Sequence, residues 1–298
     1  MTSKIVIILC VIVGLFMISY SVSWFVKDET ISTNKIAIIP IRGMIVSQDA
    51  SSFYQKTTAS STIIEFLKLA IKNENIKGIV LDINSPGGTV VASKEIAEVV
   101  KSSPKPVVAF IHEIGTSGAY WIATAADEIV ADPLSITGSI GVTASYLEFS
   151  KLFEEYGITY RSLKAGKFKD IGSPFKELTT EEQTLLEQKL DKIHDVFIRE
   201  VASNRNLTEP AVRALATGIY FLGEEAQELG LIDTLGNKEL AINKTKERAG
   251  ITDAKLTTFK KERSVVDVLS SLSIQALYSL GRGIGEAEVL PLSTMPTI

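Results

Sequence analysis

The sequence has almost no cysteine and little histidine. Its single cysteine, Cys10, lies inside an apolar run near the amino terminus. The rest of the chain therefore has no thiol for a disulfide framework, a cysteine-rich metal site or a cysteine nucleophile. His112 and His194 are the only imidazoles, although a histidine is the usual base of serine hydrolases. A hydrolase built on this chain needs one of these two side chains or a different base.

An excess of basic charge is also absent. The formal net charge is -4, so the sequence lacks the strongly basic surface that binds a phosphate backbone, and nucleic acid is not an expected partner. The chain has 298 residues, of which 45% are hydrophobic and 22% charged. This composition is typical of a globular protein with a sizeable core rather than of a disordered one.

One long uncharged run does stand at the amino terminus, at residues 5–26. As a helix rising about 1.5 Å per residue, it spans roughly 33 Å, close to the hydrocarbon thickness of a bilayer. The small side chains of Ser21 and Ser23 suggest a cleaved signal peptide instead, but the run is longer than a usual signal-peptide core. We expect an uncleaved single-pass anchor in the cell membrane. The positive-inside bias places residues 1–4 in the cytoplasm and the body of the protein on the extracytoplasmic side.

The remaining chain alternates strand and helix patterns. A polar linker at residues 27–34 precedes the folded domain, which we place at residues 35–262. Alternation of this kind predicts an α/β fold with a largely parallel sheet, and with ligand sites at the carboxyl ends of the strands. The expected strands lie at residues 35–41, 78–83 and 106–111, and the expected helices at residues 60–73, 89–100 and up to 126.

The second half of the domain is richer in helix patterns. Thr179 and Glu182 match a capping box for a helix that runs to about residue 203. Further helices are expected at residues 209–216, 223–230 and 238–249. Residues 263–298 form a carboxyl-terminal tail, which either docks on the domain or is a mobile end.

Gly87 and Gly88 follow a predicted strand and precede a predicted helix. Without a Cβ atom, a glycine lets a substrate carbonyl approach main-chain amides closely, as an oxyanion hole requires. The alternative is a tight turn that merely needs positive φ. A nucleotide-binding loop does not fit, because the spaced third glycine and a following Gly-Lys-Ser/Thr element are missing.

Ser117 lies between Gly115 and Gly118, where a predicted strand gives way to a helix. Its hydroxyl is a candidate nucleophile, and a helix N-cap is the alternative role. The surrounding pattern, Gly-Thr-Ser-Gly-Ala, lacks the last glycine of the esterase nucleophile elbow. An ordinary esterase is thereby disfavoured.

The residues offer several candidates for the base that would activate Ser117. His112 follows a strand, and His194 lies in a helix between two aspartates, on a face that we expect to be solvated. Residues 164–171 offer three lysines, Lys164, Lys167 and Lys169. A lysine serves as a base only where burial or a nearby cation favours its neutral form. Spacing alone does not separate these lysines from one another or from an ordinary solvated loop.

Four segments, in this order, resemble the motifs of the signal peptide peptidase A family. They are residues 84–88 (NSPGG), 117–123 (SGAYWIA), 137–142 (TGSIGV) and 166–171 (GKFKDI). The length resembles the short, single-domain form of that family. One departure is Ala119, which stands where the family often has glycine.

The resemblance implies the α/β fold of Clp protease and the crotonases, with repeated ββα units, preceded by one amino-terminal transmembrane helix. It implies a Ser-Lys dyad with Ser117 as nucleophile and Lys169 as base. Ser139 matches the serine that orients the lysine, and Gly88, with Gly87 beside it, matches the oxyanion turn.

The same resemblance implies that the protein needs no metal and no organic cofactor. Its expected substrates are remnant signal peptides and other apolar peptides at the membrane. The expected assembly is a homo-oligomer, with eight subunits in the short form, in which neighbouring subunits complete each active site.

Two other functions stay open at this point. A crotonase-like acyl-thioester enzyme would use the same oxyanion turn, but normally with a carboxylate as acid or base. A catalytically inactive membrane scaffold would keep the fold without the chemistry. Acylation of Ser117 by a serine-directed probe separates a protease from both, since neither alternative predicts an acylated serine.

Overall fold

The structure, a computed structural model, describes residues 12–17, 34–48 and 57–260. The chain divides into two units, Met1–Phe259 and Lys260–Ile298, and the description below concerns the first. The predicted anchor lies outside the described residues except for residues 12–17, which are helical. Among the described residues, no helix has both the length and the apolar character needed to cross a bilayer. The predicted tail at residues 263–298 also lies outside them.

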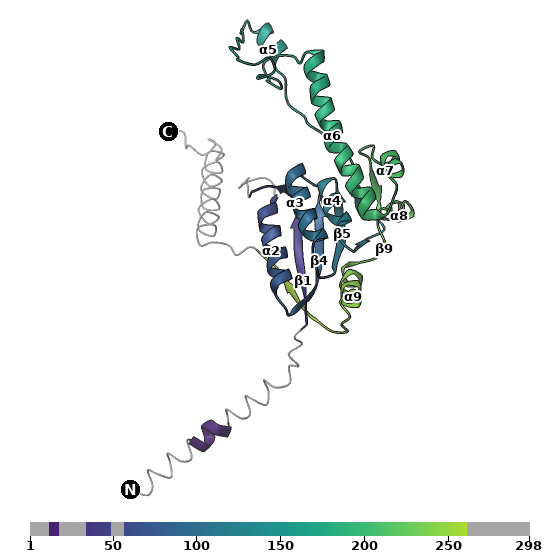
Figure 1. Ribbon diagram of the computed structural model, residues 1–298. Coiled ribbons are helices and arrows are strands. Elements are labelled where there is room, and N and C mark those ends of the chain that lie inside the picture. Colours follow the sequence, from purple (N-terminus) through teal and green to yellow (C-terminus); the bar gives the residue numbers. More distant parts are fainter. Residues whose placement is uncertain (1–11, 18–33, 49–56, 261–298) are drawn as a thin grey trace, which may run out of the picture. The chain divides into compact units, whose positions relative to one another are not determined.

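A largely parallel sheet forms the centre of the first unit (Figure 1). Its strands are β1 (Lys35–Arg42), β4 (Ile76–Ser85), β5 (Val107–Thr116), β6 (Glu128–Ala131), β7 (Ile136–Gly138), β8 (Tyr220–Leu222), β9 (Thr234–Leu235) and β10 (Lys255–Thr258). The order is β10-β1-β4-β5-β6-β9, with β7 paired to both β5 and β8. Among the described strands of this sheet, only β7 and β8 pair in antiparallel fashion. Two short strands, β2 (Met44–Val46) and β3 (Thr57–Ala59), form a separate parallel pair.

Helices cover both faces of this sheet. The helices within residues 57–260 are α2 (Ser60–Lys72), α3 (Val90–Lys101), α4 (Gly118–Thr124), α5 (Ser150–Glu155), α6 (Thr180–Arg205), α7 (Glu209–Leu215), α8 (Gly223–Glu228) and α9 (Lys238–Arg248), of which α5 and the first part of α6 lie away from the sheet. Side chains alternate along β5: Ala109 and Ile111 join the large apolar cluster that includes α2, α3 and α4, whereas Val108 and Phe110 join a smaller cluster that includes Ala241 of α9. Because both faces are buried, the central strands are almost continuously apolar. The predicted α/β class and parallel sheet are confirmed.

Residues 144–190, called the extension here, contain α5 and the first part of α6 (Figure 1). No residue of α5 is buried, and α6 buries Glu182 and then nothing before Phe197. Helix α6 therefore meets the core only in its second half. The predicted capping box is present, since Glu182 N donates to Thr179 Oγ1 at 3.2 Å and the Glu182 carboxylate accepts from Thr179 N at 3.0 Å.

The predicted end of the strand at Ile111 is wrong. The strand β5 continues to Thr116, because Gly115 and Thr116 pair with Thr137 and Gly138 of β7. Glycine and threonine before a serine favour a loop locally, and pairing with distant strands stabilises the extended conformation, since Gly115 also pairs with Ser85 of β4. Because the strand is longer, Ser117 lies directly after its carboxyl end.

Candidate active site

A pocket of about 480 Å³ lies where β4, β5 and β7 end. Pro86 and Gly88 follow β4, Ser117 and Gly118 follow β5, and Ser139 follows β7. Carboxyl ends of parallel strands meet at one edge of a sheet, so segments far apart in the chain converge there. The other lining residues are Val90, Trp121, Gly141, Val142, Thr143, His194, Phe197, Ala216, Thr217 and Gly218. The pocket thus unites three of the predicted site residues: Ser117, Gly88 and Ser139.

Ser117 joins β5 to α4 with φ 52° and ψ -124°. Its amide donates to Gly138 O at 2.8 Å, and its carbonyl accepts from Trp121 N at 2.9 Å, so hydrogen bonds hold both sides of the residue. A non-glycine residue in this conformation stores about 1–3 kcal/mol of strain, and such residues concentrate at active sites. The hydroxyl makes no capping bond to α4, which removes the N-cap role. A serine on a strained strand-to-helix turn has the geometry of a nucleophile elbow, although its sequence pattern is incomplete.

This strain gives a testable difference in stability. Ser117→Gly is expected to be more stable than Ser117→Ala, because both variants lose the hydroxyl but only glycine adopts a φ of 52° without a Cβ clash. We expect a difference of about 1 kcal/mol, or roughly 2–4 °C in Tm for a domain of this size. Differential scanning calorimetry measures it. Equal Tm values would mean that the turn is not strained.

The glycine turn packs against the main chain beside Ser117. Gly87 has φ 99°, and an added Cβ atom would lie 2.7 Å from Gly118 N. A Cβ atom on Gly118 would lie 3.3 Å from Gly88 N. Gly118 is also the first residue of α4, where an amide has no acceptor within the helix. The amides of Gly88 and Gly118 therefore lie close together next to Ser117, which is the arrangement that an oxyanion hole needs.

Ser139 lines the same pocket with φ 50°. Its amide donates to Ile219 O at 3.0 Å, and its hydroxyl donates to Gly218 O at 3.0 Å. With the hydroxyl hydrogen committed to a carbonyl, the oxygen still has lone pairs that accept from an incoming donor. A lysine amine would be such a donor.

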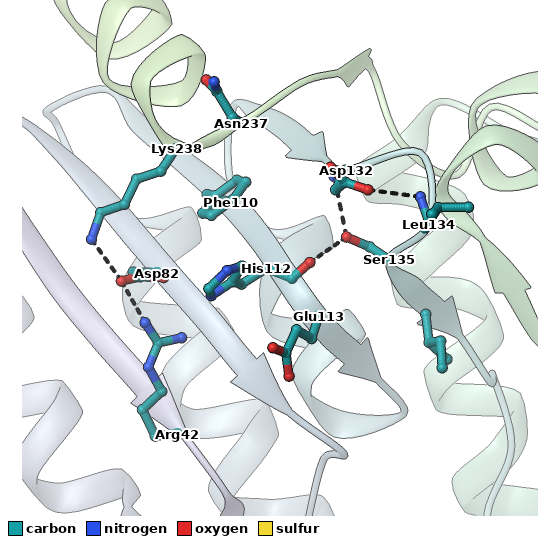
Figure 2. A pocket seen from close by; sticks show the side chains of 11 residues that line it. Arg42, Asp82, Phe110, His112, Glu113, Asp132, Leu134, Ser135, Asn237 and Lys238 are labelled. Atoms are coloured by element: carbon teal, nitrogen blue, oxygen red, sulfur yellow. Dashed lines mark hydrogen bonds and ion pairs between the residues drawn. The ribbon is translucent and has the colours of Figure 1, made fainter.

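His112 does not belong to this pocket. It projects from β5 into a second pocket of about 640 Å³ (Figure 2). The His112 ring lies 5.7 Å from the Phe110 ring, on the face of the sheet that α9 covers. Trp121, which lines the Ser117 pocket, belongs to the cluster on the other face. His112 is therefore not placed to act as a base for Ser117.

The second pocket holds a compact ion-pair cluster (Figure 2). Arg42 and Lys238 both contact Oδ2 of the buried Asp82, at 2.5 and 2.9 Å. Burial raises the pKa of Asp82, but the hydrogen bonds and the charge attraction of Lys238 and Arg42 together outweigh it and hold this pKa below its usual range. Because the three residues come from β1, α9 and β4, the cluster ties α9 to the sheet.

The expectation of a solvated His194 is wrong. His194 is half-buried and lines the Ser117 pocket, with Nε2 3.3 Å from Ile140 O. A carbonyl oxygen only accepts, so Nε2 carries the proton and Nδ1 is the acceptor in the neutral ring. Among the described residues that line this pocket, His194 is the only one with a titratable side chain. His194 reaches the pocket because the second half of α6 packs on the core, although aspartates stand near His194 in the sequence.

Lys169 lies on the extension, and it does not line the pocket that contains Ser117 of the same chain. The amine of Lys164 contacts Asp170 at 2.6 Å, and the amine of Lys167 contacts Glu181 at 2.5 and 2.7 Å. Lys169 is exposed, and within the described part of the chain its amine has no acceptor. Spacing alone did not distinguish the three lysines, but their contacts do. Lys164 and Lys167 form ion pairs, whereas the Lys169 amine forms none with the described residues.

Gly118 and His194 are two residues of the pocket with polar groups suited to the chemistry that were not predicted as parts of the site. The position of Gly118 directly after the nucleophile was an available signal, since that amide supplies one oxyanion donor at nucleophile elbows. For His194 no local signal exists, because its place depends on how α6 packs.

The sequence matches two described protein families. Residues 100–252 match peptidase family S49, and residues 42–131 match the Clp protease family. The second match is consistent with the parallel sheet of a Clp protease-like fold.

Individual relatives carry protease names. A provisionally named protease of Methanocaldococcus jannaschii is 35% identical over 80% of this chain and 77% of its own length. One of Synechocystis is 34% identical over 88% of this chain and 92% of its own. A provisionally named signal peptide peptidase SppA of Enterococcus faecium is 32% identical over 79% and 70%.

A solved structure with a similar fold is a mutant of the 1510-N membrane-bound stomatin-specific protease. It aligns with a TM-score of 0.51 and 15% identity, over 77% of this chain and 99% of its own. At this identity the likeness concerns the fold alone.

Proposed function

The chain belongs to peptidase family S49, among the signal peptide peptidase A proteins, and we propose that it is a serine endopeptidase with Ser117 as nucleophile and Lys169 as general base. The observation that carries this proposal is the setting of Ser117. It stands on a strained turn, beside the amides of Gly88 and Gly118 and in one pocket with Ser139. A nucleophile, two oxyanion donors and a hydroxyl that can hold an amine are the parts of a Ser-Lys hydrolase.

The proposed reaction has two halves. Neutral Lys169 accepts the hydroxyl proton of Ser117 while Oγ attacks the peptide carbonyl carbon, and the amides of Gly88 and Gly118 stabilise the oxyanion. The C–N bond then breaks, Lys169 returns the proton to the leaving amine, and an acyl ester stays on Ser117. Water attacks the ester with Lys169 as base, which releases the acid and restores the hydroxyl. The scheme uses no metal and no organic cofactor.

Lys169 acts in this scheme on the Ser117 of a second copy of the chain. Support comes from the exposed, uncommitted amine of Lys169 and from its absence among the residues that line the pocket of its own chain. Entry into a pocket walled by Trp121 and Phe197 would supply the burial that favours a neutral lysine.

The surface of the extension supports the same arrangement. It exposes large apolar side chains, among them Leu147 at 73%, Tyr156 at 72% and Leu163 at 101%. Contact between copies would bury them. The proposed assembly is a homo-oligomer of eight subunits.

The substrates are proposed to be apolar peptides at the membrane, chiefly remnant signal peptides. Val90, Trp121 and Phe197 give the Ser117 pocket an apolar wall that suits an apolar peptide side chain. The uncharged run at residues 5–26 would anchor the protein in the cell membrane. The catalytic body would then work at the extracytoplasmic surface, beside the peptides that processing leaves behind.

The structure disfavours one alternative. Acyl-thioester chemistry of the crotonase kind normally needs a carboxylate, and no aspartate or glutamate is among the described residues that line the Ser117 pocket. An inactive scaffold remains the second candidate, and it is separated by experiment.

Covalent labelling tests the proposal. Full-length protein in detergent is treated with a fluorophosphonate probe, and the modified peptide is identified by mass spectrometry. We expect labelling at Ser117, none in Ser117→Ala, and loss of peptide hydrolysis in the same variant. An assembled wild type that is neither labelled nor active would support the scaffold instead.

A further inference from the structure

A buried hydroxyl lies behind the oxyanion turn. Ser85 is the last residue of β4 and is fully buried. Its Oγ donates to Gly43 O at 2.6 Å and accepts from Gly87 N at 3.1 Å. One hydroxyl therefore joins the chain after β1 to the first glycine of the turn.

The residue Gly87 is held at both ends. Ser85 Oγ accepts from its amide, and its carbonyl accepts from Ile45 N at 2.8 Å. The peptide group that follows contains the Gly87 carbonyl and the Gly88 amide, and it is planar and trans. The Gly88 N–H therefore points opposite to the carbonyl that Ile45 binds. The hydrogen bonds that fix the conformation of Gly87 therefore also fix the direction of the Gly88 N–H, which is the proposed oxyanion donor.

We propose that Ser85 is a positioning residue for catalysis, whose hydroxyl holds Gly87 so that the Gly88 amide points at the developing oxyanion. This inference rests on the proposed function and adds a residue to it. Without the hydroxyl, the Gly87 amide has lost its acceptor, and its φ of 99° is no longer fixed from that side. A displaced donor weakens binding of the transition state more than binding of the substrate.

If Ser85 had a purely structural role, its loss would lower stability but would not weaken transition-state binding more than substrate binding. The test therefore measures these two kinds of binding separately. In full-length assembled protein, Ser85→Ala is expected to lower kcat by about 10–100-fold, with KM changed less than about twofold. Affinity for a peptide aldehyde, which forms a tetrahedral adduct with an oxyanion, falls by a similar factor. Affinity for an uncleavable peptide of the same sequence stays unchanged.

Three further variants keep the test decisive. Ser85→Thr retains the hydroxyl and is expected to recover most of kcat. Ser85→Cys keeps the volume but accepts hydrogen bonds weakly, so it shares the defect even if the alanine variant does not fold. Thr245→Val is the matched control, because Thr245 is also fully buried and donates to a main-chain carbonyl, Ala241 O, but lies on α9.

The possible results are distinct. A Ser85→Ala or Ser85→Cys variant that folds and keeps wild-type kcat overturns the role of Ser85. The role of Ser85 is also overturned if its variants lose affinity equally for the aldehyde and for the uncleavable peptide. A wild type that is not labelled at Ser117 overturns the proposed function itself, and this is measured before any Ser85 variant is made.

Discussion

Lys169→Ala is expected to lower the rate of Ser117 acylation, and kcat/KM for an apolar peptide, by at least about a thousandfold. Without the amine, no group takes the hydroxyl proton as Oγ attacks the carbonyl. Mass spectrometry follows the acylation, and a fluorogenic peptide follows turnover. The fold is expected to persist, because Lys169 is exposed and its side chain forms no hydrogen bond or ion pair with the described residues.

Two variants serve as controls for the choice of base. Lys167→Ala removes an exposed ion pair with Glu181 and is expected to leave kcat/KM within about twofold of the wild type. His194→Ala alters the wall of the pocket and is expected to retain Ser117 labelling. Loss of labelling in His194→Ala, together with normal labelling in Lys169→Ala, would make His194 the base.

Gly88→Ala is expected to lower kcat/KM by about a hundredfold or more. An added Cβ atom would lie 1.9 Å from Ile45 O, a main-chain atom that cannot rotate away. The turn must shift, and the Gly88 amide is the proposed oxyanion donor. Hydrolysis assays on folded protein, with circular dichroism to check the fold, measure the loss.

Gly250→Ala is the matched control for that substitution. Gly250 has φ 65° and no atom within 4 Å of an added Cβ, and it does not line the Ser117 pocket. It is expected to reduce stability through backbone strain while leaving kcat unchanged. A folded Gly88→Ala variant with wild-type kcat/KM would remove Gly88 from the oxyanion hole.

The sequence predicts those features that depend on neighbouring residues. The capping box of Thr179 and Glu182 and the apolar runs of β1 and β4 are local patterns, and the structure contains them. The meeting of Gly88 and Ser117 was also predictable, since both follow parallel strands and such strand ends share an edge.

Features that depend on distant partners were not predictable in this way. The last residues of β5 are extended because distant strands, β7 and the end of β4, pair with them. His194 reaches the Ser117 pocket only because the second half of α6 packs on the core. The lysines of the extension become distinguishable only when the partners Asp170 and Glu181 are located. Each of these depends on tertiary contacts, which residue type and spacing do not encode.

Complementation tests most directly whether one catalytic site takes its serine and its lysine from two chains. Full-length Ser117→Ala and Lys169→Ala are co-expressed so that they assemble together, after each has been shown inactive alone. Random co-assembly joins an intact serine to an intact lysine in about a quarter of the sites, so activity near that fraction of the wild type is predicted. A mixed assembly that is as inactive as its two parents would contradict the account, because Lys169 would not then serve the Ser117 of a neighbouring chain.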